Sequence, residues 1–341
     1  MTEDPRDEAP LARSVPPRPP EHRPPLGQGI KTPLLHRIAE ACITGLAFVA
    51  IAAVILIFVF VVKEALPLLW DPEALAESGG LSSLLFPSRW GDQYPEARFI
   101  WQPPKFNIVP LFVGTLKVTA LSMAISIPMG IGSAVFVSQY APAQVREVVK
   151  PALELLASLP SVVLGFFAAM VLSVWLQAAL DLPTPKNALV ASIAMSLAVV
   201  PLIFTISEDA LQAVPRQLSE AALALGARKW QTTLQVILPA ALPGITAAVI
   251  LGFGRAIGET MIVVMASGNA AVMELWNPTS SARPVTATIA AELGEVTQGS
   301  DHWRVLFLLG TLLFVLTFVI NRLGTMVVNR LHRRLMVQEG T

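Results

Sequence analysis

An arginine and a glutamate lie inside an apolar stretch, GFGRAIGETMIVVM, at residues 252–265. A charged side chain at the centre of a bilayer costs about 2.5–3.5 kcal/mol on insertion scales, so such residues usually have a partner or a function. Arg255 and Glu259 are four residues apart, which predicts one face of a continuous helix. An acid placed C-terminal to its base is the weaker helical order, so a structural ion pair is an incomplete explanation. We therefore predict that Arg255 binds an oxyanion through its planar guanidinium, with Glu259 beside it.

The composition is that of an integral membrane protein. Hydrophobic residues make up 54% of the 341-residue chain and charged residues only 14%, against about 25% charged residues in soluble domains. The formal net charge of zero gives no global basic surface for nucleic acid. Cys42 is the single cysteine, which excludes a disulfide framework and a cysteine-based metal site.

No pattern in the sequence indicates an enzyme, a metal site or a cofactor. The chain lacks the Gly-x-x-x-x-Gly-Lys-Ser/Thr phosphate loop, so a separate chain must bind any ATP that drives it. No paired carboxylates or Ser/His/Asp set is placed for catalysis. The four histidines lie outside the apolar runs without metal-ligand spacing, and we interpret them as surface residues: His22, His36, His302 and His332.

Six apolar runs are long enough to span a bilayer, which takes about 20 residues. They are residues 42–62, 110–138, 152–178, 188–206, 236–266 and 305–328. The sequence thus predicts an all-α integral membrane protein with six transmembrane helices. The third run is the least regular, because Glu154 and Pro160 lie near its start.

The Lys and Arg distribution predicts that both termini lie in the cytoplasm. With that orientation, segments on the inner side hold 15 Lys and Arg residues and segments on the outer side hold seven. The predicted regions, in chain order, are a disordered proline-rich tail (1–40), the first transmembrane helix (41–62), an outer loop (63–109), a transmembrane core (110–328) that includes the loop 207–235, and a basic tail (329–341).

A cytoplasmic loop at 207–235 predicts two helical pieces joined by a glycine corner. Glu220, Ala221 and Ala222 lie in helix-forming LSEAALAL, and Gly226 ends that helix. Together with Leu238-Pro239 at the following span, this loop resembles the EAA loop of bacterial ABC-importer permeases. The resemblance implies the type I importer permease fold and a coupling helix, in which Glu220 pairs with a basic groove of an ATPase.

The wider resemblance is to phosphate-specific importers, over residues 100–335. It rests on stretches such as LELLASLPSVVLGFFA, GFGRAIGETMIVVMASGNA and FVLTFVINRLGTMVVNRL, and the last two are closer to the PstC-type subunit than to the PstA type. The resemblance implies a bacterial inner-membrane permease that forms half of a phosphate pathway. Its partners would be a PstA-type permease, a PstB-type ATPase dimer, and a PstS-type phosphate-binding protein docked on outer loops 63–109 and 267–304.

In such a pathway Glu259 would discriminate between oxyanions. Its carboxylate would accept a hydrogen bond from a protonated phosphate oxygen, whereas sulfate carries no proton at neutral pH and would be repelled. We interpret Gly252, Gly254 and Gly258 as helix-packing residues. Lys117 is interpreted as a packing or interface residue, with attraction of anions as the alternative.

Two other functions remain open from the sequence. A permease for another oxyanion or for phosphonate would keep the coupling loop and change the residues around 255–259. A non-transporting membrane sensor or scaffold would use its partners, including the proline-rich head, for regulation alone.

Overall fold

The computed structural model describes residues 34–71, 73, 75–76, 79–86 and 100–338. Contacts divide the chain into two compact units, Met1–Ile55 and Leu56–Thr341. The described part of the first unit is the beginning of the apolar helix α1 (Leu34–Ala65). This helix begins at Leu34, within the segment 1–40 that the sequence predicts to be a disordered tail. The proline-rich head before Leu34, which includes His22, lies outside the described residues, and so does Trp90.

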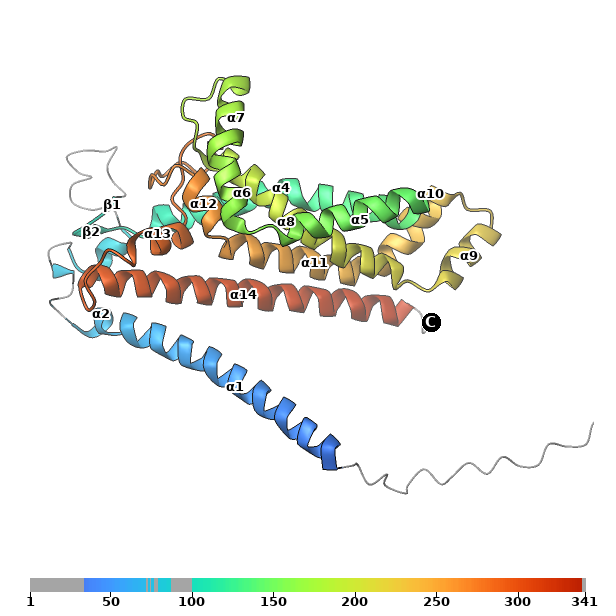
Figure 1. Cartoon of the computed structure of the whole chain (residues 1–341), viewed down its shortest axis with the longest axis horizontal. Helices are drawn as coiled ribbons and strands as arrows, with labels where there is room; N and C mark the ends of the chain where they lie inside the picture. Colours follow the sequence, from blue (N-terminus) through green and yellow to red (C-terminus); the bar gives the residue numbers. More distant parts are fainter. Residues whose placement is uncertain (1–33, 72, 74, 77–78, 87–99, 339–341) are drawn as a thin grey trace, which may run out of the picture. The chain divides into compact units, whose positions relative to one another are not determined.

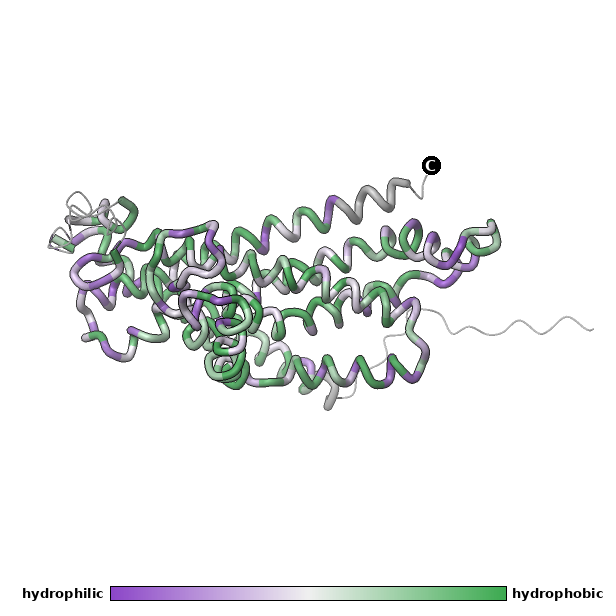
Figure 2. The backbone as a smooth tube through the Cα atoms, turned by 90° about the horizontal axis from the view of Figure 1, so that it is seen from above, coloured by the Kyte–Doolittle hydropathy of each residue, from purple (hydrophilic) through white to green (hydrophobic). Residues whose placement is uncertain are grey.

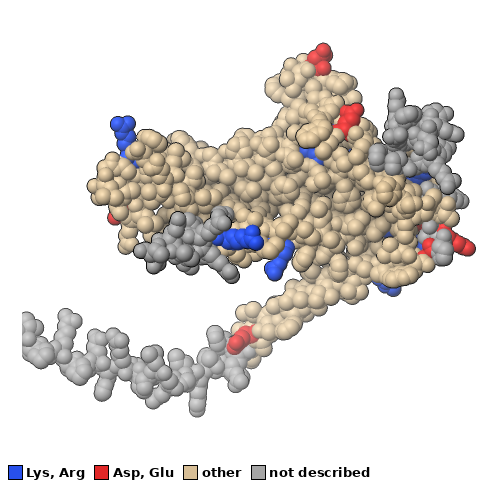
Figure 3. All heavy atoms as spheres, turned by 180° about the vertical axis from the view of Figure 1, so that it is seen from behind, with Lys and Arg blue, Asp and Glu red and all other residues tan. Residues whose placement is uncertain are grey.

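The six predicted membrane spans are confirmed in number within the described ranges. Six helical segments are long and apolar enough to cross a bilayer: Ile38–Trp70, Val109–Tyr140, Ser161–Leu180, Ala188–Gln212, Lys229–Gly258 and Asp301–Arg330. Figure 3 shows one face of the molecule on which most of the surface carries no charged side chain. Such a surface suits the hydrocarbon core of a bilayer.

The second unit is built almost entirely of helices (Figure 1). Before the core come α2 (Pro67–Trp70), the short η2 (Leu81–Leu84) and an antiparallel hairpin of β1 (Trp101–Gln102) and β2 (Lys105–Phe106). The core then runs through α4 (Val109–Val135), η4 (Phe136–Tyr140), α5 (Ala143–Ser158), α6 (Ser161–Phe167), η5 (Ala168–Leu172), α7 (Ser173–Leu180) and α8 (Ala188–Gln212). It ends with α9 (Arg216–Ala224), α10 (Lys229–Thr232), η6 (Thr233–Ile237), α11 (Leu238–Gly258), α12 (Met261–Ala266), α13 (Val285–Glu292) and α14 (Asp301–Gln338).

The third span begins later than the sequence predicted. The sequence predicts one span at 152–178, but Leu159 and Pro160 have extended backbone and separate α5 from α6. A residue before proline is disfavoured in the α conformation, so the Leu-Pro pair ends α5. Helix α5 is therefore a separate amphipathic helix, and the span is Ser161–Leu180.

Helix α8 lies at the centre of the core, packed against α4 and α11. The central apolar cluster includes Val118, Met195 and Ile203, all nearly inaccessible to solvent. Gly252 permits the close approach of α11 to α8, because a Cβ there would lie 2.9 Å from Ile203 Cγ1. The prediction of a packing role for Gly252 is thus confirmed.

The other two glycines of that stretch differ. A Cβ on Gly254 would make an ordinary contact with Asn321 at 3.4 Å, whereas one on Gly258 would meet nothing within 4 Å in the described part of this chain. The predicted packing role of Gly258 is therefore not found within this chain.

Polar groups gather at the ends of the second unit rather than along its helices (Figure 2). At one end lie α9 and the end of α14, and at the other lie α2, α13 and the β-hairpin (Figure 1). The hairpin end has its own apolar cluster, in which Trp101 and Phe106 pack with Leu306. Trp101 is buried, whereas Trp70 is exposed.

Candidate functional site

The loop predicted to couple to an ATPase forms a short exposed helix with a tight corner. Helix α9 ends in a Schellman turn: the Gly226 N–H donates to Leu223 O at 3.0 Å and the Ala227 N–H to Ala222 O at 3.1 Å. Gly226 has a φ of +86°, which an L side chain rarely adopts. The two helical pieces and glycine corner predicted from the sequence are confirmed.

The outer side of α9 is available to a partner. Glu220 and Ala221 are exposed and Ala222 is half-buried. Leu225, at the C-cap, is 90% exposed, and no residue of α9 is buried. Leu238 and Pro239 are the first two residues of α11 and directly follow the π-helical turn η6.

The break after α11 overturns the predicted geometry of Arg255 and Glu259. Glu259 has extended backbone, with a ψ of 132°, and separates α11 from α12. The two residues therefore do not share one face of a continuous helix, and the span predicted at 236–266 ends at Gly258. Among the ion pairs of the described residues, none joins Arg255 to Glu259.

Glu259 is held in this break by backbone contacts. Its Oε1 accepts from Thr260 N–H at 3.2 Å and, more weakly, from Ile262 N–H at 3.5 Å. Its backbone carbonyl accepts from Thr286 Oγ1, on α13, at 2.7 Å. The described residues donate no hydrogen bond to Oε2, so one carboxylate oxygen of a half-buried side chain remains available to a ligand.

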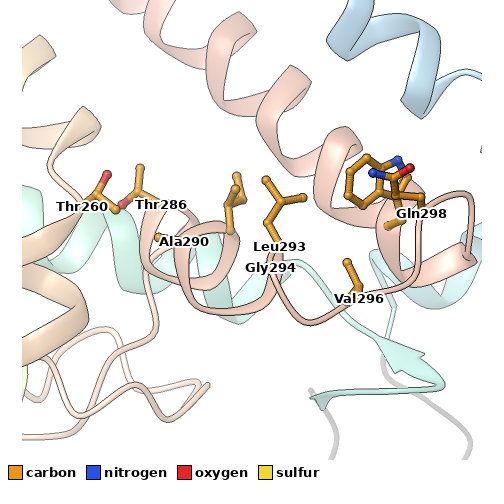
Figure 4. Close-up of a pocket in the computed structure, with 9 residues that line it drawn as sticks. Thr260, Thr286, Ala290, Leu293, Gly294, Val296 and Gln298 are labelled. Atoms are coloured by element: carbon orange, nitrogen blue, oxygen red, sulfur yellow. The ribbon is translucent and has the colours of Figure 1, made fainter.

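The packing of α12 also fixes the position of this break, and a cavity lies beside it. Helix α12 packs against α6 at Gly165, where a Cβ would lie 2.9 Å from Met261 O. Thr260 and Thr286 lie together at one end of an open cavity of about 800 Å³ that follows α13 as far as Gln298 (Figure 4). Arg255, one turn before the break, is exposed on α11.

Lys117 is a packing residue in the structure. Its Nζ donates to Glu274 O at 2.9 Å and to Ser280 Oγ, which ties α4 to the loop between α12 and α13. The side chain is buried. The packing interpretation is supported over attraction of anions.

The sequence did not predict an ion pair that joins α5 to α8. Lys150, on α5, donates to Glu208, on α8, with 2.9 Å between Nζ and Oε2. The Glu208 side chain is fully inaccessible, whereas that of Lys150 is 35% exposed. The hydrogen bond to Glu208 raises the pKa of Lys150 above its ordinary value. The only signal in the sequence was Glu208, an acid near the end of an apolar run, and nothing in the sequence indicated Lys150 as its partner.

At the opposite end, one carboxylate joins three segments. Glu292, on α13, accepts from Trp101 Nε1 at 3.0 Å, pairs with Arg283, and contacts His302 Nε2 at 2.8 Å. His302 is therefore part of a packed polar cluster, and its interpretation as a surface residue was wrong. No group of three or more metal-ligating side chains occurs among the described residues.

The family described as "Binding-protein-dependent transport system inner membrane component" matches residues 126–335, and the chain belongs to this family. The permease of a bacterial ABC transporter involved in alginate import shares the fold, with a TM-score of 0.54 and 16% identity over 86% of this chain and 99% of that one. The type I importer permease fold is confirmed.

Two curated relatives resemble the chain more closely in sequence. A probable ABC transporter permease protein, YqgH of Bacillus subtilis, is 37% identical over 223 residues, which cover 64% of this chain and 72% of YqgH. The phosphate transport system permease protein PstC 1 of Mycobacterium tuberculosis is 33% identical over 249 residues, which cover 67% of this chain and 74% of that protein.

Proposed function

We propose that this chain is the PstC-type permease subunit of an ATP-driven phosphate importer in a bacterial inner membrane. The observation that carries the proposal is α9, an exposed helix closed by a positive-φ glycine in a chain whose sequence has no phosphate loop of its own. The PstC relatives support phosphate as the substrate. Separate ATPase chains drive the cycle, a second permease of the PstA type completes the pathway, and a PstS-type binding protein delivers phosphate from outside.

The arrangement of the ends supports the proposed orientation. Helix α9 and the end of α14 lie at the same end of the second unit (Figure 1). The α14 sequence there is rich in arginine, with Arg330, Arg333 and Arg334. Basic residues beside a span favour the cytoplasmic side. Helix α9 then faces the ATPases, and the Glu292 cluster faces the exterior.

Arg255 and Glu259 act in this proposal from two separate segments. Arg255 is exposed on α11, where a second permease would complete its surroundings. Its guanidinium binds the anion, and the unoccupied Oε2 of Glu259 accepts a hydrogen bond from a protonated phosphate oxygen. The helix break lets Glu259 remain fixed by α12 and α13 while α11 moves.

Uptake by the reconstituted four-component complex tests the proposal. We expect Arg255→Gln to lower phosphate uptake about 100-fold, because it removes a charged partner from a desolvated anion. Lys63→Gln, which removes an exposed cation from α1, is the matched control and should transport normally. Normal uptake by Arg255→Gln in a correctly assembled complex would remove Arg255 from the pathway.

The same uptake assay tests which anion the complex transports. Glu259→Gln should weaken the preference for phosphate over sulfate, measured by competition, since the amide no longer repels an unprotonated anion. Unchanged selectivity would exclude that role. If phosphonate or another oxyanion were transported while phosphate was not, the substrate assignment would be wrong. A complex that binds its partners but transports nothing would indicate a sensor.

A further inference from the structure

A second polar cavity lies beneath α9, away from Arg255 and Glu259. Its volume is about 280 Å³, and it is bounded by η4, α5, the end of α8 and the start of α9. Two arginines line it, Arg146 and Arg216, together with the polar side chains of Ser138, Gln139, Gln212 and Ser219. None of its lining residues is acidic. Its lining therefore carries a net positive charge.

Arg146 is held in place by the protein backbone. Its Nε and Nη2 donate to Val137 O at 3.2 and 3.0 Å, and Nη2 also donates to Ser138 O at 3.0 Å. These bonds fix the plane of the guanidinium and leave Nη1 with no bond to a described residue. A fixed guanidinium loses little conformational entropy when it binds an anion.

Arg216 faces the cavity from the other side. It is the first residue of α9, it is exposed, and its side chain has no hydrogen bond or ion pair with any residue that the structure describes. The positive end of the α9 helix dipole lies at Arg216 and adds positive potential nearby. Two arginines that line one small cavity repel each other, and an anion bound in the cavity would offset that repulsion.

The carboxylate that contacts the cavity lining through Gln212 is already compensated. Glu208 lies behind Gln212, whose Nε2 donates to it, and it is paired with Lys150. Glu208 therefore does not neutralise Arg146 or Arg216. The remaining lining groups, hydroxyls and amides, can donate to oxygen.

We infer that this cavity binds a phosphate-type oxyanion that bridges Arg146 and Arg216. The planar fork of arginine suits a tetrahedral oxyanion, and the cavity has room for the anion and its waters. A bound anion would join α5 to α9, a helix without buried residues of its own. The anion is either free inorganic phosphate or the phosphate of a lipid headgroup. Binding of an anion in this cavity requires neither a particular transported substrate nor a particular direction of transport.

Protection of an introduced thiol detects occupancy of this cavity. The full chain, with Cys42→Ser and Ser219→Cys, is purified with its associated subunits in phosphatidylcholine nanodiscs. Modification by an anionic thiosulfonate is measured against increasing inorganic phosphate, with potassium chloride at matched ionic strength. Ala224→Cys, exposed at the end of α9 and outside the cavity, is the control thiol. We expect phosphate to protect at position 219 only.

Charge variants establish which side chains bind. Arg216→Gln should raise the phosphate concentration for half-protection at least about tenfold, because it removes a charge-assisted hydrogen bond. Arg228→Gln, which removes an exposed arginine outside the cavity, should not change it. Arg146→Lys keeps the charge but loses the fork, and it should also weaken protection.

The source of the anion is separated by the lipid. Protection that appears in phosphatidylglycerol nanodiscs without added phosphate, and disappears in Arg216→Gln, assigns the site to a lipid headgroup. No protection in either lipid, equal protection by potassium chloride, or protection unchanged in Arg216→Gln would overturn the inference. Arg255→Gln should retain protection while it loses uptake, so failure of the transport proposal is distinguishable from failure of this site.

Discussion

The α9 corner and the Glu259 break both interrupt a helix, yet they are stabilised in opposite ways. The α9 corner is local: a Schellman turn closes it and none of its helix is buried. The Glu259 break is tertiary: Thr286, 27 residues away, bonds to its carbonyl, and α6 packs on the helix that follows. A local corner can move as a unit against a partner, whereas a tertiary break holds a side chain still.

This contrast predicts that the α9 corner fails through one backbone position. Gly226→Val should abolish phosphate-stimulated ATP hydrolysis by the complex, because a β-branched residue at positive φ costs about 1–3 kcal/mol and would distort the docking helix. Gly226→Asn, which tolerates the left-handed conformation, should retain most of the activity. Equal activity of the two variants would show that the corner geometry is not required.

The Glu259 break should fail through a distant side chain. Thr286→Val removes the hydroxyl that donates to the Glu259 carbonyl, at a cost of about 1 kcal/mol, and should reduce uptake roughly fivefold. Thr286→Ser keeps the hydroxyl and should restore transport. If valine and serine behaved alike, the break would not depend on this bond.

The smallest expected effect concerns Lys150, which ties α5 to α8 near α9. Its pKa is raised in the folded chain by the hydrogen bond to Glu208, so the pair contributes stability below the pKa of the unfolded state. That contribution is lost as the pH rises through the folded pKa. The stabilisation that this pair adds to the thermal unfolding temperature of the complex should thus be constant between about pH 7 and 9 and should decrease above about pH 10.5.

Lys150→Gln is the reference for that measurement. It should be less stable than the parent at neutral pH, because it leaves Glu208 buried without a cation, and the difference should shrink at high pH. A difference that stayed constant across this range would mean that the charge of Lys150 does not stabilise the fold.

The sequence predicted what local chemistry determines. Hydropathy located the six spans, and Gly226 after a run of helix formers located the α9 corner. The Leu159-Pro160 pair carried a local signal for the end of α5, but the apolar run around it obscured that signal.

Contacts between distant residues were not predictable from one sequence. The break at Glu259 follows no proline and lies inside an apolar run, so only its contact with Thr286 and the packing at Gly165 place it. The same holds for Glu292, which bonds to Trp101 across 191 positions, and for Glu208 with Lys150. Glu292 lies on α13 and Trp101 on β1, so only the tertiary fold brings them together, and the same is true of Lys150 on α5 and Glu208 on α8.

The most direct test of the account is site-directed crosslinking from α9. A photoreactive residue replaces Glu220 in the full complex, and the products are identified by mass spectrometry in the resting and nucleotide-bound states. We predict crosslinks to the ATPase subunit, with a yield that changes with nucleotide, because Glu220 is exposed on the helix that docks there. Crosslinks to the external binding protein, or none to an ATPase in an assembled complex, would contradict the account.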